Sequence, residues 1–259
     1  MIQTHRFGNG PELLIAFHGF GDRGRLFAAL EPFLGEHYTI VAPDLPFHGE
    51  TQWTRKTFSK EDLLNLVHRI LEQEGKTQFS LMGYSFGARL AMAMTPELLE
   101  NLSTLYLLAP EGFKTKGTQT ATRIPMWSRR LLHRVLEKPK LFLVPLRLGR
   151  KLGIVPKLTY GFLDANLSNR DRLMRTFGYW YALDAFLISA RNIRTLWSNS
   201  HLPVEVYIGS RDVIVPLKPL QQLTKGISNV RLHVLAGEGH RLVGAALAQR
   251  LADEKNKRK

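Results

Sequence analysis

Short apolar runs recur along the chain, and most of them lack the alternation of apolar and polar positions that marks a strand with one solvated face. Such uninterrupted runs predict strands covered on both faces, as in parallel sheets. We expect six strands, at residues 13–17, 38–42, 79–82, 104–108, 204–208 and 230–235. Segments of helical periodicity lie between them, at residues 26–33, 61–73, 89–99, 217–223 and 242–251. This alternation predicts an α/β protein, a mostly parallel twisted sheet with helices on both faces.

The alternation breaks between residues 110 and 200. That span is helical in character, is punctuated by prolines and contains no convincing strand. An insertion of this size between two strands is typical of a helical cap over the carboxyl ends of the strands, where ligands bind in such sheets. We therefore expect a core formed by residues 1–110 and 201–259, with residues 111–200 as a helical cap insertion that includes its return helix.

Composition limits the chemistry. The chain has 259 residues, 44% of them hydrophobic, which is enough for one large core. It has no cysteine, which excludes disulfides, a thiolate nucleophile and a cysteine-ligated metal, and we expect neither a metal nor another cofactor. The first residues lack the apolar run of a signal peptide, and no apolar stretch is long enough to cross a bilayer, so we expect a cytoplasmic protein.

The net charge of +14 is concentrated in the inserted segment. Residues 111–200 hold 17 Lys or Arg against 5 Asp or Glu. Residues 123–135 and 138–157 mix these cations with large apolar side chains. Such a surface suits an acidic, lipid-like substrate or peripheral contact with an anionic membrane. The alternative is a solvated basic face over apolar side chains that pack on the core. No nucleic-acid-binding motif accompanies the charge, so we do not expect a nucleic-acid partner, and the sequence leaves the oligomeric state open.

One turn carries the sequence pattern of a nucleophile. The strand at 79–82 runs into Gly83-Tyr84-Ser85-Phe86-Gly87, and a helix is expected from about residue 88. This is Gly-x-Ser-x-Gly between a strand and a helix, the context that gives the motif its meaning. A side chain at either flanking position would collide with neighbouring backbone, so both positions are glycine. The turn lifts Ser85 clear of the sheet beside the positive end of the helix.

A serine nucleophile needs a base, and the base needs an orienting acid. Asp212 follows the strand at 204–208, and His240 follows the strand at 230–235, so both lie at the same edge of the sheet as Ser85. The order Ser, Asp, His is the one expected for this kind of sheet. Glu111, just after the strand at 104–108, is a second carboxylate at that edge. We prefer Asp212 as the acid and keep Glu111 as its rival.

The sequence resembles the α/β-hydrolase superfamily over nearly its whole length. The resemblance is carried by the turn at Ser85, by the Gly-Ser-Arg-Asp-Val-Ile-Val-Pro block at 209–216 and by Gly-Glu-Gly-His at 237–240. It implies that the backbone amides of Phe20 and Phe86 form an oxyanion hole. His18, in the resembling His-Gly-Phe loop, is interpreted as a structural brace, and residues 44–51 as a turn held by Pro and Gly.

The resemblance implies a serine hydrolase that cleaves an ester, thioester or related acyl bond through an acyl-enzyme on Ser85. Arg89 and Tyr84 also resemble the menaquinone-pathway synthase that eliminates pyruvate from SEPHCHC, an enzyme that uses an arginine at the equivalent place to hold substrate carboxylates. Elimination or carbon–carbon hydrolysis by the same residues is therefore the alternative, and a non-enzymatic binding protein is a further one. The substrate-pocket candidates are Tyr84, Arg89, Trp127 and Trp180.

Overall fold

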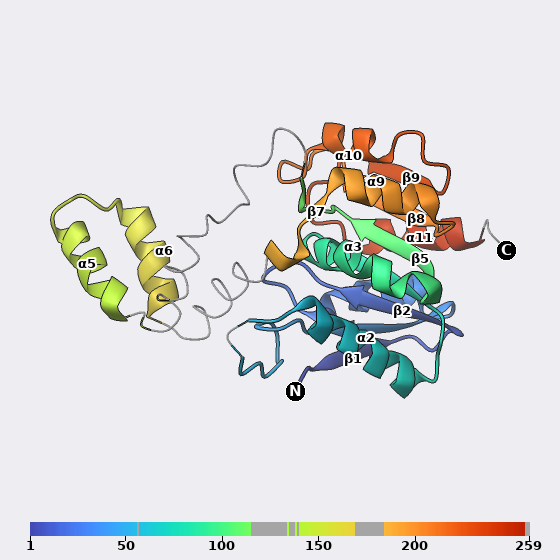
Figure 1. Cartoon of the computed structure of the whole chain (residues 1–259), viewed down its shortest axis with the longest axis horizontal. Helices are drawn as coiled ribbons and strands as arrows, with labels where there is room; N and C mark the ends of the chain where they lie inside the picture. The colour runs from blue at the N-terminus through green and yellow to red at the C-terminus, as the bar shows by residue number, and fades with distance from the viewer. Residues whose placement is uncertain (56, 115–133, 135–137, 139, 169–183, 257–259) are drawn as a thin grey trace.

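The structure is a computed structural model of the chain, and it describes all residues except 56, 115–133, 135–137, 139, 169–183 and 257–259. Its core is a seven-stranded sheet (Figure 1) in which only the first strand runs antiparallel to its neighbour. In spatial order the strands are β1 (Thr4–Phe7), β3 (Tyr38–Pro43), β2 (Glu12–Phe17), β4 (Phe79–Tyr84), β5 (Leu102–Leu108), β8 (Val204–Gly209) and β9 (Val230–Leu235). The predicted α/β class and mostly parallel sheet are confirmed.

The central strands are buried because helices cover both faces of the sheet. Every residue of β3, β4 and β8 is buried, which is the environment that their mainly apolar runs predict. The one charged residue among them, Glu205 of β8, is paired with His233 and Arg231. Helices α2 (Lys60–Glu74), α3 (Phe86–Leu98), α9 (Ala190–Asn199) and α10 (Leu217–Thr224) lie toward the viewer in Figure 1, while α11 (Ala245–Asn256) lies behind the sheet. There α11 packs against α1 (Glu31–Leu34).

The predicted helices all occur, with shifted ends and one change of type. The segment expected at 26–33 is a 3-10 helix, η1 (Gly24–Leu30), followed by the single turn of α1. A one-turn 3-10 helix, η2 (Leu99–Asn101), follows α3. The edge strand β1 was not predicted, because its sequence Thr-His-Arg-Phe is polar and only half buried. Its partner β3 supplies the pairing that the local sequence does not indicate.

The inserted segment contains more structure than helices. The expectation that it holds no strand is wrong at two places: β6 (Phe113–Lys114) and β7 (Ile188–Ser189) form a two-stranded parallel sheet. Strands of two residues are too short to produce a sequence pattern. The described helices of the segment are α5 (Lys140–Lys151), α6 (Lys157–Leu167), the 3-10 turn η4 (Asp184–Phe186) and α9.

The inserted segment divides into two parts by where its apolar side chains pack. Ile193 and Trp197 of α9 belong to the main core, whereas α5 and α6 pack against each other around a small cluster of their own. This helix pair lies to the side of the sheet in Figure 1. The domain boundaries, and a cap over the active edge of the sheet, stay predictions, since much of the connecting chain is outside the described residues. Among the described helices, none has the length and apolar character needed to span a membrane.

Candidate active site

Ser85 occupies a strained turn between β4 and α3. Its backbone has φ 52° and ψ −112°, a left-handed conformation that a residue with a side chain rarely adopts. Its amide donates a hydrogen bond to the carbonyl of Leu108 at the end of β5, at 2.8 Å. Strain of this kind persists only where the surrounding structure imposes it, and it is found mostly at functional sites.

The two glycines of the turn are required by close backbone approach, as the sequence predicts. A Cβ atom on Gly83 would lie 2.5 Å from Cα of Ala88, and one on Gly87 would lie 2.1 Å from the carbonyl oxygen of Phe17. Neither neighbour can move, because each belongs to the backbone of a core element. The glycines thus allow α3 to start directly above the sheet, with Ser85 at its amino end.

The structure brings Ser85, His240 and Asp212 together in a hydrogen-bonded row. His240 Nε2 lies 2.9 Å from Oγ of Ser85, and His240 Nδ1 lies 2.8 Å from Oδ2 of Asp212. The other carboxylate oxygen of Asp212 accepts the backbone amides of Ile214 and Val215, at 2.8 and 2.9 Å. The Asp212 side chain is fully buried, and hydrogen bonds to both of its oxygens fix its orientation. This is the geometry of a nucleophile, a base and an orienting acid.

The loops that carry Asp212 and His240 are tied to each other. The amide of Arg211 donates to the carbonyl of Glu238 at 2.9 Å, and the amide of Gly237 donates to Oγ of Ser210 at 2.9 Å. Gly209, which ends β8, lies so close to the second loop that a Cβ atom there would be 2.2 Å from the carbonyl oxygen of Gly239. The 28-residue separation of acid and histidine is therefore closed by main-chain contacts.

The rival carboxylate, Glu111, faces a different partner. Its Oε1 lies 3.7 Å from Nη2 of Arg89, whose side chain is only 3% exposed. Gly112 lies over the guanidinium, because a Cβ atom there would be 1.8 Å from Nε of Arg89. Nε and Nη1 of Arg89 are buried without a hydrogen-bond partner among the described residues. The structure thus places Asp212 at the histidine and puts Arg89 under the chain at 111–112; a contact between Arg89 and substrate stays a prediction.

Tyr84 lies beside His240, and two charged residues that the sequence does not single out, Asp22 and Arg241, interact electrostatically in the same place. The rings of Tyr84 and His240 are 5.6 Å apart, and burial together with the charge of Asp22 raises the pKa of Tyr84 to about 12. Burial also raises the pKa of Asp22, while the charges of Arg241 and His240 act against that rise. Position along the chain is the signal that could have identified them: Asp22 lies in the loop between β2 and η1, and Arg241 directly follows His240.

The loop after β2 lies against the start of α3. Besides the contact with Phe17, Gly87 is close to the carbonyl of His18, which brings the segments that carry Phe20 and Phe86 side by side. His18 Nδ1 lies 2.7 Å from the carbonyl of Gly19, and its Nε2 accepts the amide of Leu45 at 3.0 Å. Burial is the main cause that lowers the pKa of His18 to about 3, so the ring is neutral. Its contacts agree with a brace.

The turn at 44–51 is organised by a buried carboxylate as well as by its Pro and Gly. Asp44 accepts the amides of Gly24 and Glu50, at 2.7 and 2.8 Å, and lies 3.1 Å from Nε2 of His5. The remaining pocket candidates, Trp127 and Trp180, lie outside the described residues.

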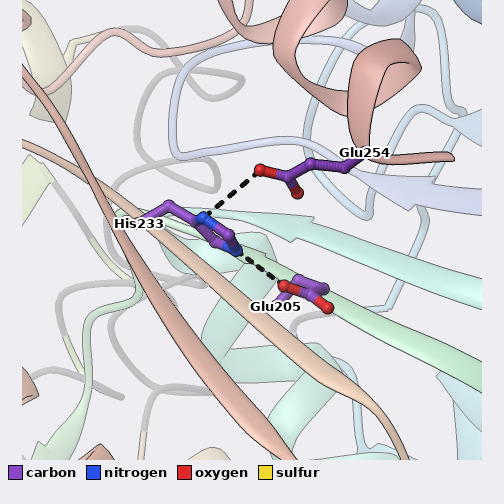
Figure 2. Close-up of side chains that lie close together, drawn as sticks. All are labelled: Glu205, His233 and Glu254. Atoms are coloured by element: carbon purple, nitrogen blue, oxygen red, sulfur yellow. Dashed lines mark hydrogen bonds and ion pairs between the residues drawn. The ribbon is translucent and has the colours of Figure 1, made fainter. Parts of the chain in front are cut away.

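A second cluster, of two carboxylates and a histidine, lies between strands β8 and β9 and helix α11. In Figure 2, His233 stands between Glu205 and Glu254, with its Nε2 2.7 Å from one and its Nδ1 3.3 Å from the other. Each carboxylate also has an arginine partner, Arg231 at 3.3 Å and Arg250 at 2.7 Å. Because both imidazole nitrogens face different carboxylates, the cluster is best described as an ion-pair network that fastens α11 to the sheet.

Comparison with known proteins agrees with this fold. The family model described as alpha/beta hydrolase fold matches residues 12–243. An uncharacterised protein of Mycobacterium tuberculosis, Rv2715, is 24% identical over a match that covers 90% of this chain and 71% of the length of Rv2715. The monoacylglycerol lipase abhd6-A of Xenopus laevis is 22% identical, covering 91% and 72%. The structure of MenH from S. aureus superposes with a TM-score of 0.68 at 20% identity, covering 100% of this chain and 99% of that one. The chain belongs to the alpha/beta hydrolase fold family.

Proposed function

We propose that the chain is a serine hydrolase that cleaves a carboxylic ester or related acyl bond through an acyl-enzyme on Ser85. The observation that carries the proposal is the row of hydrogen bonds from Ser85 Oγ through His240 to the buried Asp212, at 2.9 and 2.8 Å. A lipase among the relatives, the monoacylglycerol lipase of Xenopus laevis, supports the same reaction class.

The reaction has two halves. Nε2 of His240 takes the proton of Ser85 as Oγ attacks the carbonyl carbon, and the resulting imidazolium returns a proton to the leaving group as the acyl-enzyme forms. Water, deprotonated by the same nitrogen, then attacks the acyl-enzyme and releases the acid and Ser85. Asp212 holds the proton on Nδ1 throughout, so that Nε2 is free to act as the base.

The negative oxygen of each tetrahedral intermediate needs two preorganised donors. We assign this role to the main-chain amides of Phe20 and Phe86. Phe86 begins α3, where the helix dipole also favours negative charge. Only backbone atoms donate, so phenylalanine is allowed at both positions: the Phe86 ring is fully buried in the core, whereas the Phe20 ring is 44% exposed and packs edge-on against His48.

A fluorophosphonate probe tests this proposal. The wild-type protein should become labelled at Ser85, and Ser85→Ala should abolish the labelling. Ser103→Ala is the matched control, since Ser103 is exposed on β5 and lies away from the histidine. A folded wild-type protein that no serine-directed probe labels would contradict the proposal. Profiling p-nitrophenyl esters by chain length then defines the acyl group.

Elimination of pyruvate is the second candidate, favoured by one observation. Arg89 lies one helical turn beyond Ser85 with two buried nitrogens that have no hydrogen-bond partner among the described residues. A substrate carboxylate would satisfy them, although Glu111 already pairs with the guanidinium and Gly112 covers it, and for this reason we rank hydrolysis first. Incubation with SEPHCHC decides between them: release of pyruvate at a rate above that of ester cleavage would favour the elimination.

A further inference from the structure

Helix α5 presents an exposed row of aliphatic side chains. The exposed fractions of Leu141, Val144, Leu148 and Leu152 lie between 57 and 69%, far above those of the core leucines. Their spacing of three and four residues places them along one face of the helix and its carboxyl end. We call these four residues the α5 apolar stripe. Large exposed apolar rows are uncommon on proteins that need no partner there.

The stripe is distinct from the face by which α5 packs. Leu143 of α5 and Leu167 of α6 are buried against each other, together with Phe142, Leu146 and Leu163. These residues form a cluster separate from the main core. One apolar face of α5 thus packs against α6, and among the described residues no side chain buries the α5 apolar stripe on the other face.

Cations border the stripe on one side. Residues 138–163 contain six Lys or Arg and no Asp or Glu. Arg147 and Lys151 each lie three residues after a member of the stripe, Val144 and Leu148, so they flank it along the same side of the helix. Arg147 is 3.8 Å from Asp164, and both side chains are substantially exposed. In the described part of the chain, Lys151 has no ion pair, and its charge is available to an external anion.

We propose that the α5 apolar stripe and its flanking cations dock on the surface of an anionic lipid bilayer. An amphipathic helix of this kind lies in the plane of the interface, with its aliphatic side chains among the acyl chains and its cations beside the phosphate groups. The stripe combines leucine and valine side chains with neighbouring cations and no acidic residue over residues 138–163. An anionic lipid surface complements both properties, since it offers acyl chains to the stripe and phosphate groups to the cations.

Binding to vesicles tests the docking independently of the proposed hydrolysis. Sedimentation with phosphatidylcholine vesicles, with and without phosphatidylglycerol, is measured for the wild-type protein and for Ser85→Ala, which we expect to bind alike. Binding should require phosphatidylglycerol and should weaken at high salt. Lys151→Ala should lower the partition coefficient about fivefold, since each cation contributes about that factor at such a surface. Leu148→Ser should lower it about tenfold through the loss of apolar burial.

Two matched variants separate docking from general effects. Lys76→Ala removes an exposed cation from the loop after α2, and Val234→Ser removes a 43% exposed aliphatic side chain from the edge strand β9; both should bind like the wild type. Equal binding to neutral and anionic vesicles would overturn the proposal, as would Leu148→Ser and Lys151→Ala binding at the wild-type level. Self-association, detected by sedimentation velocity and abolished by Leu148→Ser without any vesicle binding, would assign the stripe to a second copy and also overturn it.

Discussion

Replacing Asp212 with Asn tests which carboxylate orients the histidine. In the wild type, one oxygen of Asp212 accepts two backbone amides, and the other lies 2.8 Å from Nδ1 of His240. In the variant, the amide oxygen must stay with the two backbone donors, so the NH2 group faces Nδ1 and donates to it. The imidazole proton is then forced onto Nε2, the nitrogen that has to accept the proton of Ser85.

The expected loss is large because the wrong tautomer removes the base. Where an orienting aspartate has been changed in this way in a serine protease, the rate falls by about 10⁴-fold. We expect a fall of about 10³–10⁴-fold in kcat/KM for Asp212→Asn, equivalent to about 4–5.5 kcal/mol in the barrier. The assays are hydrolysis of p-nitrophenyl butyrate and the rate of fluorophosphonate labelling, with circular dichroism to establish that the variant is folded.

Glu111→Gln is the matched control, because it neutralises the rival carboxylate at the same edge of the sheet. Glu111 contacts Arg89 and not the histidine, so we expect this variant to keep its kcat/KM within about tenfold of the wild type. The opposite pattern, a loss of thousands-fold in Glu111→Gln with Asp212→Asn nearly unaffected, would refute the assignment of the acid.

Three further predictions concern stability. Burial lowers the pKa of His18 from 6.5 to about 3 in the folded protein. Between these two pH values only the unfolded chain binds the proton, so the free energy of unfolding should fall by about 1.4 kcal/mol for each pH unit of acidification. Urea unfolding at several pH values measures this slope, and His18→Gln should reduce it. Gly112→Ala should lower the free energy of unfolding by about 1–3 kcal/mol, because φ at this position is +87° and the new Cβ atom would collide with the Arg89 guanidinium. An unchanged urea midpoint would contradict this. Glu254→Gln should lose about 1–3 kcal/mol by weakening the network that holds α11, whereas Asp253→Asn next to it should change stability by less than about 0.5 kcal/mol.

Much of the fold and site could be predicted from the sequence because the relevant signals are local. Short apolar runs located six strands of the seven-stranded sheet. Those of β3 and β4 are buried throughout, whereas the alternating run of β9 is an edge strand in which only Val230 is buried. The turn at Ser85 is recognisable in the sequence because only glycine fits at positions 83 and 87. The strand β1 could not be predicted, because an edge strand that is partly exposed needs no apolar pattern and is held by its pairing with β3.

The tertiary structure decided what local patterns leave equivalent. Asp212 and Glu111 both follow a strand at the same edge of the sheet. Hydrogen bonds between the loops at 209–212 and 235–238, from the main chain and from the Ser210 hydroxyl, hold the first of them at His240. The sequence makes Arg89 a candidate for the substrate pocket, but its burial and its pairing with Glu111 follow from the chain at 111–112 that passes over it. In α5, apolar residues occur on two faces, and packing against α6 determined which face is buried and which is exposed. Sequence periodicity records which residues avoid water, but the partner that each one meets depends on how distant segments pack.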